Sequence, residues 1–270
     1  MTPLVALAEP LDRLIEALDA ETYRRRQAPY RRKLTRELRR AFRRQQREVL
    51  AAFAEQRSVL FREAVGDVPL DWLLGALTLS SRWITGAIQR ALPAAVLAGA
   101  RSVLGRLRDA FDLRNPRAVA FMREALNRSS RITDETFRQL RDVITKGIDE
   151  GLSYTQMAKA IREKFRQFAT PTPQRHIRDR AELIAVTEIG DAYSAGTLMA
   201  AQRLADRGIR MEKSWLTVGD DRVEEECAGN QEQGWIALEL PFSSGDSRPL
   251  AHPACRCALL TRIASDTRKP

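Results

Sequence analysis

The chain has 270 residues, of which 44% are hydrophobic, and it carries a formal net charge of +10. This length exceeds one typical domain and this composition supports a packed core, which excludes an intrinsically disordered chain. Three cysteines in the whole sequence are too few for a disulfide-rich secreted domain, and the opening residues lack the basic segment of a secretory signal, so we expect synthesis in a reducing cytoplasm.

The positive charge is concentrated in residues 24–47, where twelve basic residues face one acidic residue, Glu37, while the rest of the chain holds 33 basic and 34 acidic residues. Leu34, Leu38 and Phe42 recur at helical spacing and predict a basic amphipathic helix over about residues 30–57. Two interpretations stay open: a solvated helix face, or a surface that binds DNA phosphates or an acidic partner without reading base sequence. The candidate binding residues are Arg31, Arg32, Lys33, Arg36, Arg39, Arg40, Arg43, Arg44 and Arg47.

Residues 71–112 are predicted to form buried helices that follow a helix start near Asp71. Their uncharged windows are separated by Arg82 and Arg90 and broken by Pro93, whereas a spanning helix needs roughly 20 nearly uninterrupted apolar residues. We therefore expect a buried helical hairpin and no stable membrane span.

Capping patterns place further helices over about residues 116–166. Asn115 is an N-cap candidate ahead of Pro116, and proline is favoured at the first helical position. Thr133 is expected to cap a second helix that Gly151 ends. The run that starts at Ser153 has a capping-box pattern and predicts a third helix.

The run ATPTPQ at residues 169–174 predicts the main boundary, which separates a helical region (1–170) from a second unit (171–270). A long helix is expected from about His176 to Arg207, and strand-like alternation follows in residues 213–219 and 257–263. The sequence thus predicts an α+β fold, in which a mostly α-helical N-terminal region precedes a small α+β module with few short strands.

The small module has few large apolar residues, and a unit with so small a core needs a further stabilising element, such as a disulfide or a bound metal. Its expected core anchors are Trp215, Trp235 and Phe242.

The cysteines and a histidine are candidates for that stabilising element. Cys255 and Cys257 would face the same side of a strand, just after His252. With Cys227 they would form a Cys3His zinc site, for which Glu224 is an alternative ligand. Buried thiols beside a packing histidine, a disulfide, and a catalytic Cys–His pair also fit the spacing, although no third group that would orient such a pair is evident.

The C-terminal half contains an ordered set of motifs over roughly residues 180–263: RAELIAVTEIGDAYSAG, WLTVGDDRV, a later Gly-Trp, LPF and HPACRC. This order is similar to that of the phage head morphogenesis proteins, the Mu F-like minor head proteins of tailed phages. Many relatives carry a CxxC pair ahead of the last run. Glu224 stands where the first of those cysteines would be, so a complete ligand set here needs Glu224 or His252.

This resemblance implies a structural protein of the virion head rather than an enzyme, made in the cytoplasm of a bacterial host. It implies a minor capsid component at the portal vertex that acts in head assembly and in DNA packaging or delivery. The implied partners are the portal protein, the major capsid protein, or both, and packaged DNA.

Two alternative functions remain at this point. A metal-dependent nuclease or processing enzyme would use Asp220 and Asp221, which otherwise cap a turn. A membrane-active ejection protein would use residues 71–107.

Overall fold

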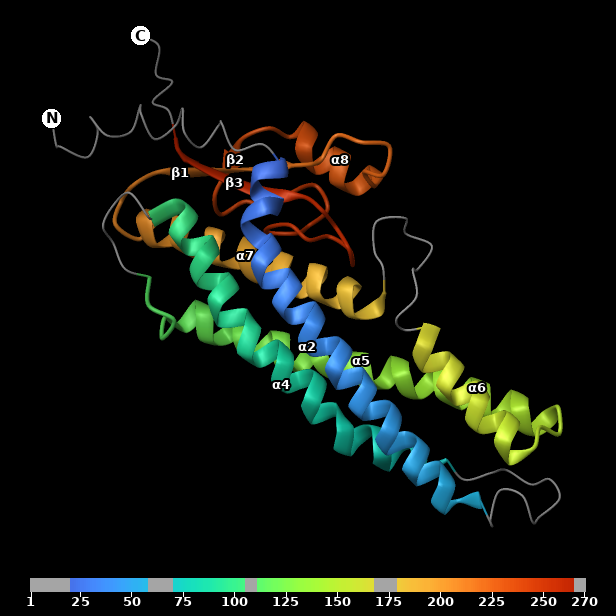
Figure 1. The fold of residues 1–270 in the computed structure, drawn as a ribbon. Coiled ribbons are helices and arrows are strands. Elements are labelled where there is room, and N and C mark those ends of the chain that lie inside the picture. The colour runs from blue at the N-terminus through green and yellow to red at the C-terminus, as the bar shows by residue number, and fades with distance from the viewer. Residues whose placement is uncertain (1–19, 58–69, 105–110, 168–178, 265–270) are drawn as a thin grey trace, which may run out of the picture. The chain divides into compact units, whose positions relative to one another are not determined.

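A computed structural model describes residues 20–57, 70–104, 111–167 and 179–264. Long helices and one small antiparallel sheet make up the described chain (Figure 1), which confirms the predicted α+β class. The elements are α2 (Ala20–Glu55), α4 (Asp71–Leu104), α5 (Pro116–Asp149), α6 (Tyr154–Gln167), α7 (Arg180–Ala205), β1 (Met211–Leu216), α8 (Glu225–Glu232), β2 (Ile236–Ala237) and β3 (Ala258–Ile263).

The chain divides into two compact units, and four helices (α2, α4, α5 and α7) contribute residues to both. Unit 1 comprises Met1–Arg31, Ala91–Met122 and Val186–Pro270, and unit 2 comprises Arg32–Arg90 and Arg123–Ala185. The boundary predicted between residues 170 and 171 lies in 168–178, outside the described residues.

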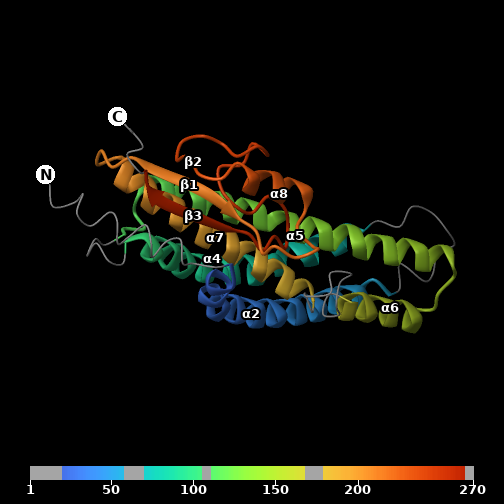
Figure 2. The same cartoon turned by 90° about the horizontal axis from the view of Figure 1, so that it is seen from above.

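Unit 1 contains the sheet, whose strand order is β2-β1-β3. The two strands expected from the sequence pair antiparallel, with Met211 opposite Ile263 and Leu216 opposite Ala258. Helix α7 runs along the sheet (Figure 2) and shares a buried apolar cluster with it, in which Leu204 joins Trp215. Helix α7 therefore supplies part of the hydrophobic core of the module, whose own large apolar residues are few.

Helices α4 and α7 approach each other backbone to backbone within unit 1. A Cβ added at Gly99 would lie 2.0 Å from the Tyr193 carbonyl oxygen, and one added at Gly196 would lie 2.0 Å from the Val96 carbonyl oxygen. Only glycine leaves room for such a contact, since any side chain would force the helices apart.

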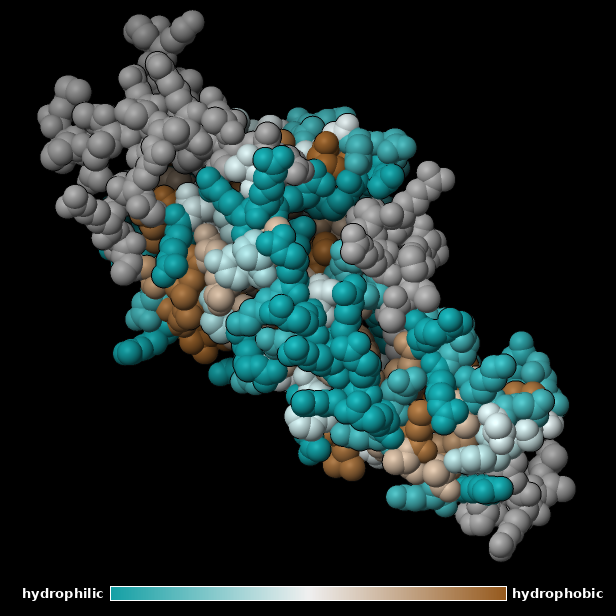
Figure 3. Space-filling view, viewed as in Figure 1, coloured by the Kyte–Doolittle hydropathy of each residue, from teal (hydrophilic) through white to brown (hydrophobic). Residues whose placement is uncertain are grey.

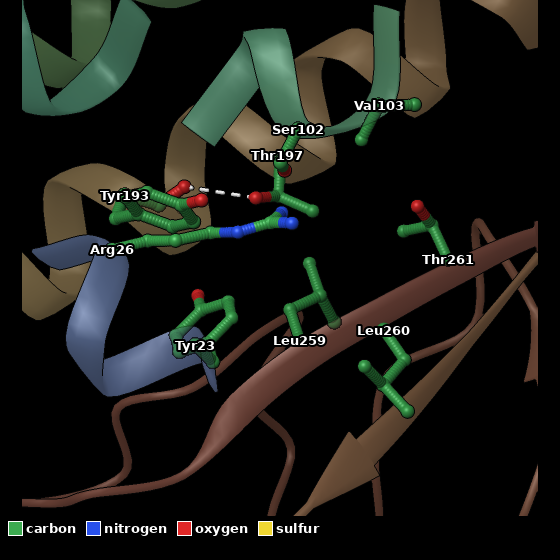
Figure 4. A pocket seen from close by; sticks show the side chains of 9 residues that line it. All are labelled: Tyr23, Arg26, Ser102, Val103, Tyr193, Thr197, Leu259, Leu260 and Thr261. Carbon is green, nitrogen blue, oxygen red and sulfur yellow. Dashed lines mark hydrogen bonds between the residues drawn. The ribbon is translucent and has the colours of Figure 1, made fainter. Parts of the chain in front are cut away.

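A small cavity between α2, α4, α7 and β3 marks the polar part of this core (Figure 4). Its volume of about 20 Å³ is close to that needed by a single water molecule. The Tyr23 and Ser194 hydroxyls are hydrogen-bonded at 2.9 Å, and Thr197 Oγ1 donates to the Tyr193 carbonyl at 3.1 Å. Burial raises the pKa of Tyr23 well above its usual value. The cavity is a packing feature, because it is too small for a larger ligand.

Unit 2 is built from helices whose apolar stripes face one another. The predicted stripe of α2 is buried at Leu34, Leu38, Phe42, Val49 and Phe53. At its end the Phe53 ring stacks on Tyr154 of α6, with centroids 5.0 Å apart and planes within 2°. Distributed apolar contact of this kind stabilises long helices far more than their intrinsic propensity does.

Three helix ends follow the chemistry expected from the sequence. Asn115 Oδ1 accepts a hydrogen bond from the Arg117 N–H at 2.8 Å. Gly151, with φ +66°, follows the end of α5. The Ser153 N–H donates to Gln156 Oε1 at 2.8 Å ahead of α6, which completes the predicted capping box.

Two other local expectations are wrong. Helix α4 is continuous through Pro93 in place of a hairpin, since Leu92 and Val96 bury apolar side chains on both sides of the missing hydrogen bond. Helix α5 runs past Thr133 without a new start, because Thr133 is itself buried and its face continues to Leu140. No described helix combines the length and the hydropathy that crossing a bilayer requires.

Candidate metal centre

The candidate metal centre joins α8 to the loop ahead of β3. Cys227 lies in the first turn of α8, and His252 and Cys255 lie in the loop that leads to Ala258. The β1–β3 pairing returns this loop to the end of the sheet from which the chain leaves for α8. The fold thereby brings together residues that are 25 to 28 positions apart.

The three side chains form a tight cluster, since their ligand atoms all lie within 4.8 Å of one another. Cys227 Sγ is 3.5 Å from His252 Nε2 and 3.8 Å from Cys255 Sγ. Zinc bonds of about 2.3 Å to sulfur and about 2.05 Å to nitrogen would, in a tetrahedron, separate two sulfurs by about 3.8 Å and sulfur from nitrogen by about 3.6 Å. Both distances in the cluster are close to these edges, so the donor set fits zinc.

The same distances distinguish the cluster from a disulfide, in which the sulfurs would lie about 2.05 Å apart. All three cysteines of the chain are free thiols, and all three are buried. The residues would bind a metal without any movement larger than side-chain adjustment.

Of the other two predicted ligands, Cys257 contacts this cluster through a hydrogen bond to Cys255, and Glu224 lies outside it. Cys257 is 6% exposed but is not part of the set whose atoms lie within 4.8 Å. The strand expected to align it with Cys255 begins only at Ala258, after both cysteines. Glu224 precedes α8 with its side chain exposed. The structure thus brings together three of the four residues of the predicted Cys3His set.

The three thiols have different pKa values, because burial and the hydrogen bonds among them affect each thiol differently. A hydrogen bond from the Cys257 thiol, helped by the nearby His252, lowers the pKa of Cys255 to about 6. Burial, followed by the neighbouring Cys255, raises the pKa of Cys227 to about 12, and the bond to Cys255 raises the pKa of Cys257 far above its usual value. Cys255 therefore forms a thiolate first, and the thiolate is the form that binds a metal.

Contacts on both sides hold the loop that carries His252 and Cys255. The Ala254 N–H donates to Thr187 Oγ1 at 3.0 Å, and Ala254 has the left-handed φ of 62° that alanine rarely adopts. Arg256 donates two hydrogen bonds of 2.6 Å to the carboxylate of Asp220. Sequence inspection missed Arg256, although its position between two cysteines was a signal.

The acidic pair considered for a nuclease does not form a metal site in the described residues. The Arg256 guanidinium holds the pKa of Asp220 down to about 2, so this carboxylate is occupied by an ion pair. The side chain of Asp221 is 93% exposed. Within the described ranges, the cysteine–histidine cluster is the set of three or more candidate ligands that lie close enough to share an ion.

The core anchors of the module surround an unexpected buried charge. Trp215 and Phe242 are buried and meet edge to face at 5.1 Å, while Trp235 is half-buried under Arg262. Lys213, 1% exposed, lies over the Phe242 ring and donates to the Ser247 carbonyl oxygen at 2.8 Å. Desolvation lowers the pKa of Lys213 to about 8. The charged residue contributes to the module core, which the strand pattern did not predict.

The basic run forms a surface along α2, seen as a continuous hydrophilic face in Figure 3. Of the nine predicted binding residues, Arg31 and Arg39 are partly buried, and Arg39 pairs with Asp179 at 2.6 Å. The other seven recur at intervals of three and four residues, so they lie on one side of the helix. We call these seven exposed residues the basic face: Arg32, Lys33, Arg36, Arg40, Arg43, Arg44 and Arg47.

Comparison with protein families gives a match to the family described as Phage Mu protein F like protein, over residues 138–260. Neither curated proteins nor solved structures match the chain. The matched residues include the whole candidate metal centre, with Cys227, His252 and Cys255. The resemblance seen in the motif order is thereby confirmed, since residues 138–260 match the family of Mu F-like phage head morphogenesis proteins.

Proposed function

We propose that this protein is a minor head protein at the portal vertex, where it acts in capsid assembly and in DNA packaging or delivery. The observation that carries the proposal is the family match over residues 138–260, because it spans all of α7 and most of the module built on it. The role is structural: in the described residues His252 and the thiols of Cys227 and Cys255 are grouped as metal ligands would be, and the Asp220 carboxylate is paired with Arg256.

Within this role, the metal centre stabilises the module. Cys227, His252 and Cys255 would hold a zinc ion, with Cys257 or Glu224 as the fourth ligand after a local adjustment. A closed tetrahedral zinc site supplies folding free energy rather than catalysis. This fits a module whose own large apolar residues are few.

The basic face supplies the contact with DNA in this proposal. Seven positive side chains on one side of a helix would repel one another unless an anion neutralises them, and DNA offers such anions at regular spacing. The contact would be independent of base sequence, because arginines that bind phosphates position a protein without reading bases.

Co-expression with the portal protein of the same phage or prophage tests the proposal. We expect the two proteins to co-purify through size-exclusion chromatography, and the major capsid protein expressed alone serves as the comparison partner. Assembly with the major capsid protein and not with the portal would contradict the portal location. Failure to associate with either protein, or to enter assembled heads, would contradict the head function as a whole.

A further inference from the structure

Unit 2 contains a groove of about 360 Å³ between α2, α6 and the start of α7. This volume lies within the range of about 300–1,000 Å³ that is typical of ligand sites. Gln46 of α2 joins the two helices at the groove by donating to the Arg162 carbonyl oxygen at 3.5 Å. The lining includes four arginines and two phenylalanines, namely Arg39, Arg43, Arg162, Arg166, Phe42 and Phe165.

The arginines of the groove differ in whether an acidic residue neutralises them. Arg39 pairs with Asp179, and Arg166 pairs with Glu163. Arg43 from α2 and Arg162 from α6 are exposed and pair with no acidic group in the described ranges. The groove therefore presents two unneutralised guanidinium groups from two helices.

The two phenylalanines of the groove offer little surface on which a ligand's aromatic ring could stack. Phe42 is 6% exposed and Phe165 is 5% exposed, and the guanidinium of Arg180 lies over the Phe42 ring at 5.5 Å. Little aromatic surface remains for a base to stack on. Guanidinium groups, by contrast, bind phosphate oxygens through paired, charge-assisted hydrogen bonds.

The groove is also continuous with the basic face, because Arg43 belongs to both. A ligand held by Arg43 and Arg162 would meet further positive charge along α2, at Arg36, Arg40 and Arg47. Such an arrangement suits a polymer with a phosphate at every repeat better than a protein surface with scattered carboxylates.

We propose that the groove is a phosphate-binding site for duplex DNA, in which Arg43 and Arg162 hold one backbone segment while the basic face contacts its neighbours. This inference rests on the proposed DNA contact and specifies where the strand is held. Arg162 lies outside the basic run of the sequence, and its role depends on the packing of α6 against α2.

Fluorescence anisotropy with the full chain and a labelled DNA duplex tests the site. The variant Arg43→Gln/Arg162→Gln is compared with Arg131→Gln/Arg141→Gln, which removes two exposed arginines of α5 and so loses the same charge. We expect the groove variant to bind at least tenfold more weakly and the control less than threefold. The slope of log affinity against log salt should fall by about 1.8 in the groove variant, since each lost phosphate contact contributes about 0.9.

Each outcome separates the groove from the wider function. Equal losses in the two variants would overturn the groove while leaving DNA binding by the basic face intact. Absence of DNA binding by the unmodified protein would overturn both. If the groove variant kept its DNA affinity and instead lost affinity for polyglutamate, the groove would bind an acidic protein segment, and the proposal would fail.

Discussion

The contacts that hold the helices together differ between units 1 and 2. In unit 2 the stabilising contacts are spread along apolar stripes, such as the one on α2 that ends in the Phe53–Tyr154 stack. In unit 1 a buried apolar cluster is joined by close contacts at single points, namely the Gly99–Gly196 crossing and the cluster around Cys227. A single substitution removes only a small part of an apolar stripe, whereas a substitution at a close backbone contact or at a metal ligand removes that contact altogether. We therefore expect comparable changes to have far larger effects in unit 1.

The largest effect is expected at the metal centre. Replacing Cys255 with serine should reduce bound zinc from about one equivalent to below one-tenth, and should lower Tm by roughly 10 °C or more, since a structural zinc site contributes several kcal/mol to folding. Metal analysis of the purified protein and a thermal melt with and without a chelator measure both quantities.

Two further variants identify the fourth ligand. Cys257→Ser and Glu224→Gln are matched tests, and the variant that lowers zinc affinity marks the residue that completes the site. A purified, folded protein that holds less than one-tenth of an equivalent of zinc and melts identically with chelator would show that the cluster is a set of packed thiols.

A pair of glycine substitutions in α4 compares the two units directly. Gly99→Ala in unit 1 should destabilise the protein by about 3 kcal/mol or more, because the added carbon would overlap the Tyr193 carbonyl. Gly75→Ala in unit 2, where a Cβ would meet nothing within 4 Å, should stabilise it by about 0.5–1 kcal/mol through helix propensity. Urea unfolding measures both, and a similar sign for the two changes would refute the backbone contact.

The smallest effect concerns the buried charge of Lys213, whose pKa of about 8 lies below its usual value. The folded state disfavours the charged form, so this group destabilises the protein below pH 8, and the penalty is relieved as the pH rises from about 8 towards the unfolded value of about 10.4. Lys213→Met should remove this rise. Urea midpoints at pH 7.5 and pH 10 for both proteins give the difference, and identical pH dependence would contradict the assignment.

Local chemistry explains which parts of the fold could be predicted from sequence. Asn115, Gly151 and Ser153 act through hydrogen bonds and backbone angles within a few residues, so their patterns were sufficient. Pro93 and Thr133 gave equally clear local signals, but burial of neighbouring side chains outweighed them. Tertiary packing routinely overrides weak helix-stop signals of this kind.

The candidate site shows the same limit. A thinly packed module with three cysteines indicated a cluster of Cys227, His252 and Cys255, and the fold brings these three together. The position of Cys257 could not be predicted. Placing it beside Cys255 on one face of a strand would have required β3 to begin two or three residues before Ala258. The groove was equally out of reach, since Arg162 is distant in sequence from the basic run and joins it only through helix packing.

The contacts of Ala254 and Arg256 have a consequence for how the protein would acquire its metal. Protein groups already fix the loop on both sides, through Thr187 and Asp220, so little chain entropy remains to be lost when an ion arrives. Preorganised sites of this kind gain affinity by avoiding the cost of ordering. Metal binding would then require little rearrangement of this loop, and most of the zinc's binding free energy would remain to stabilise the module.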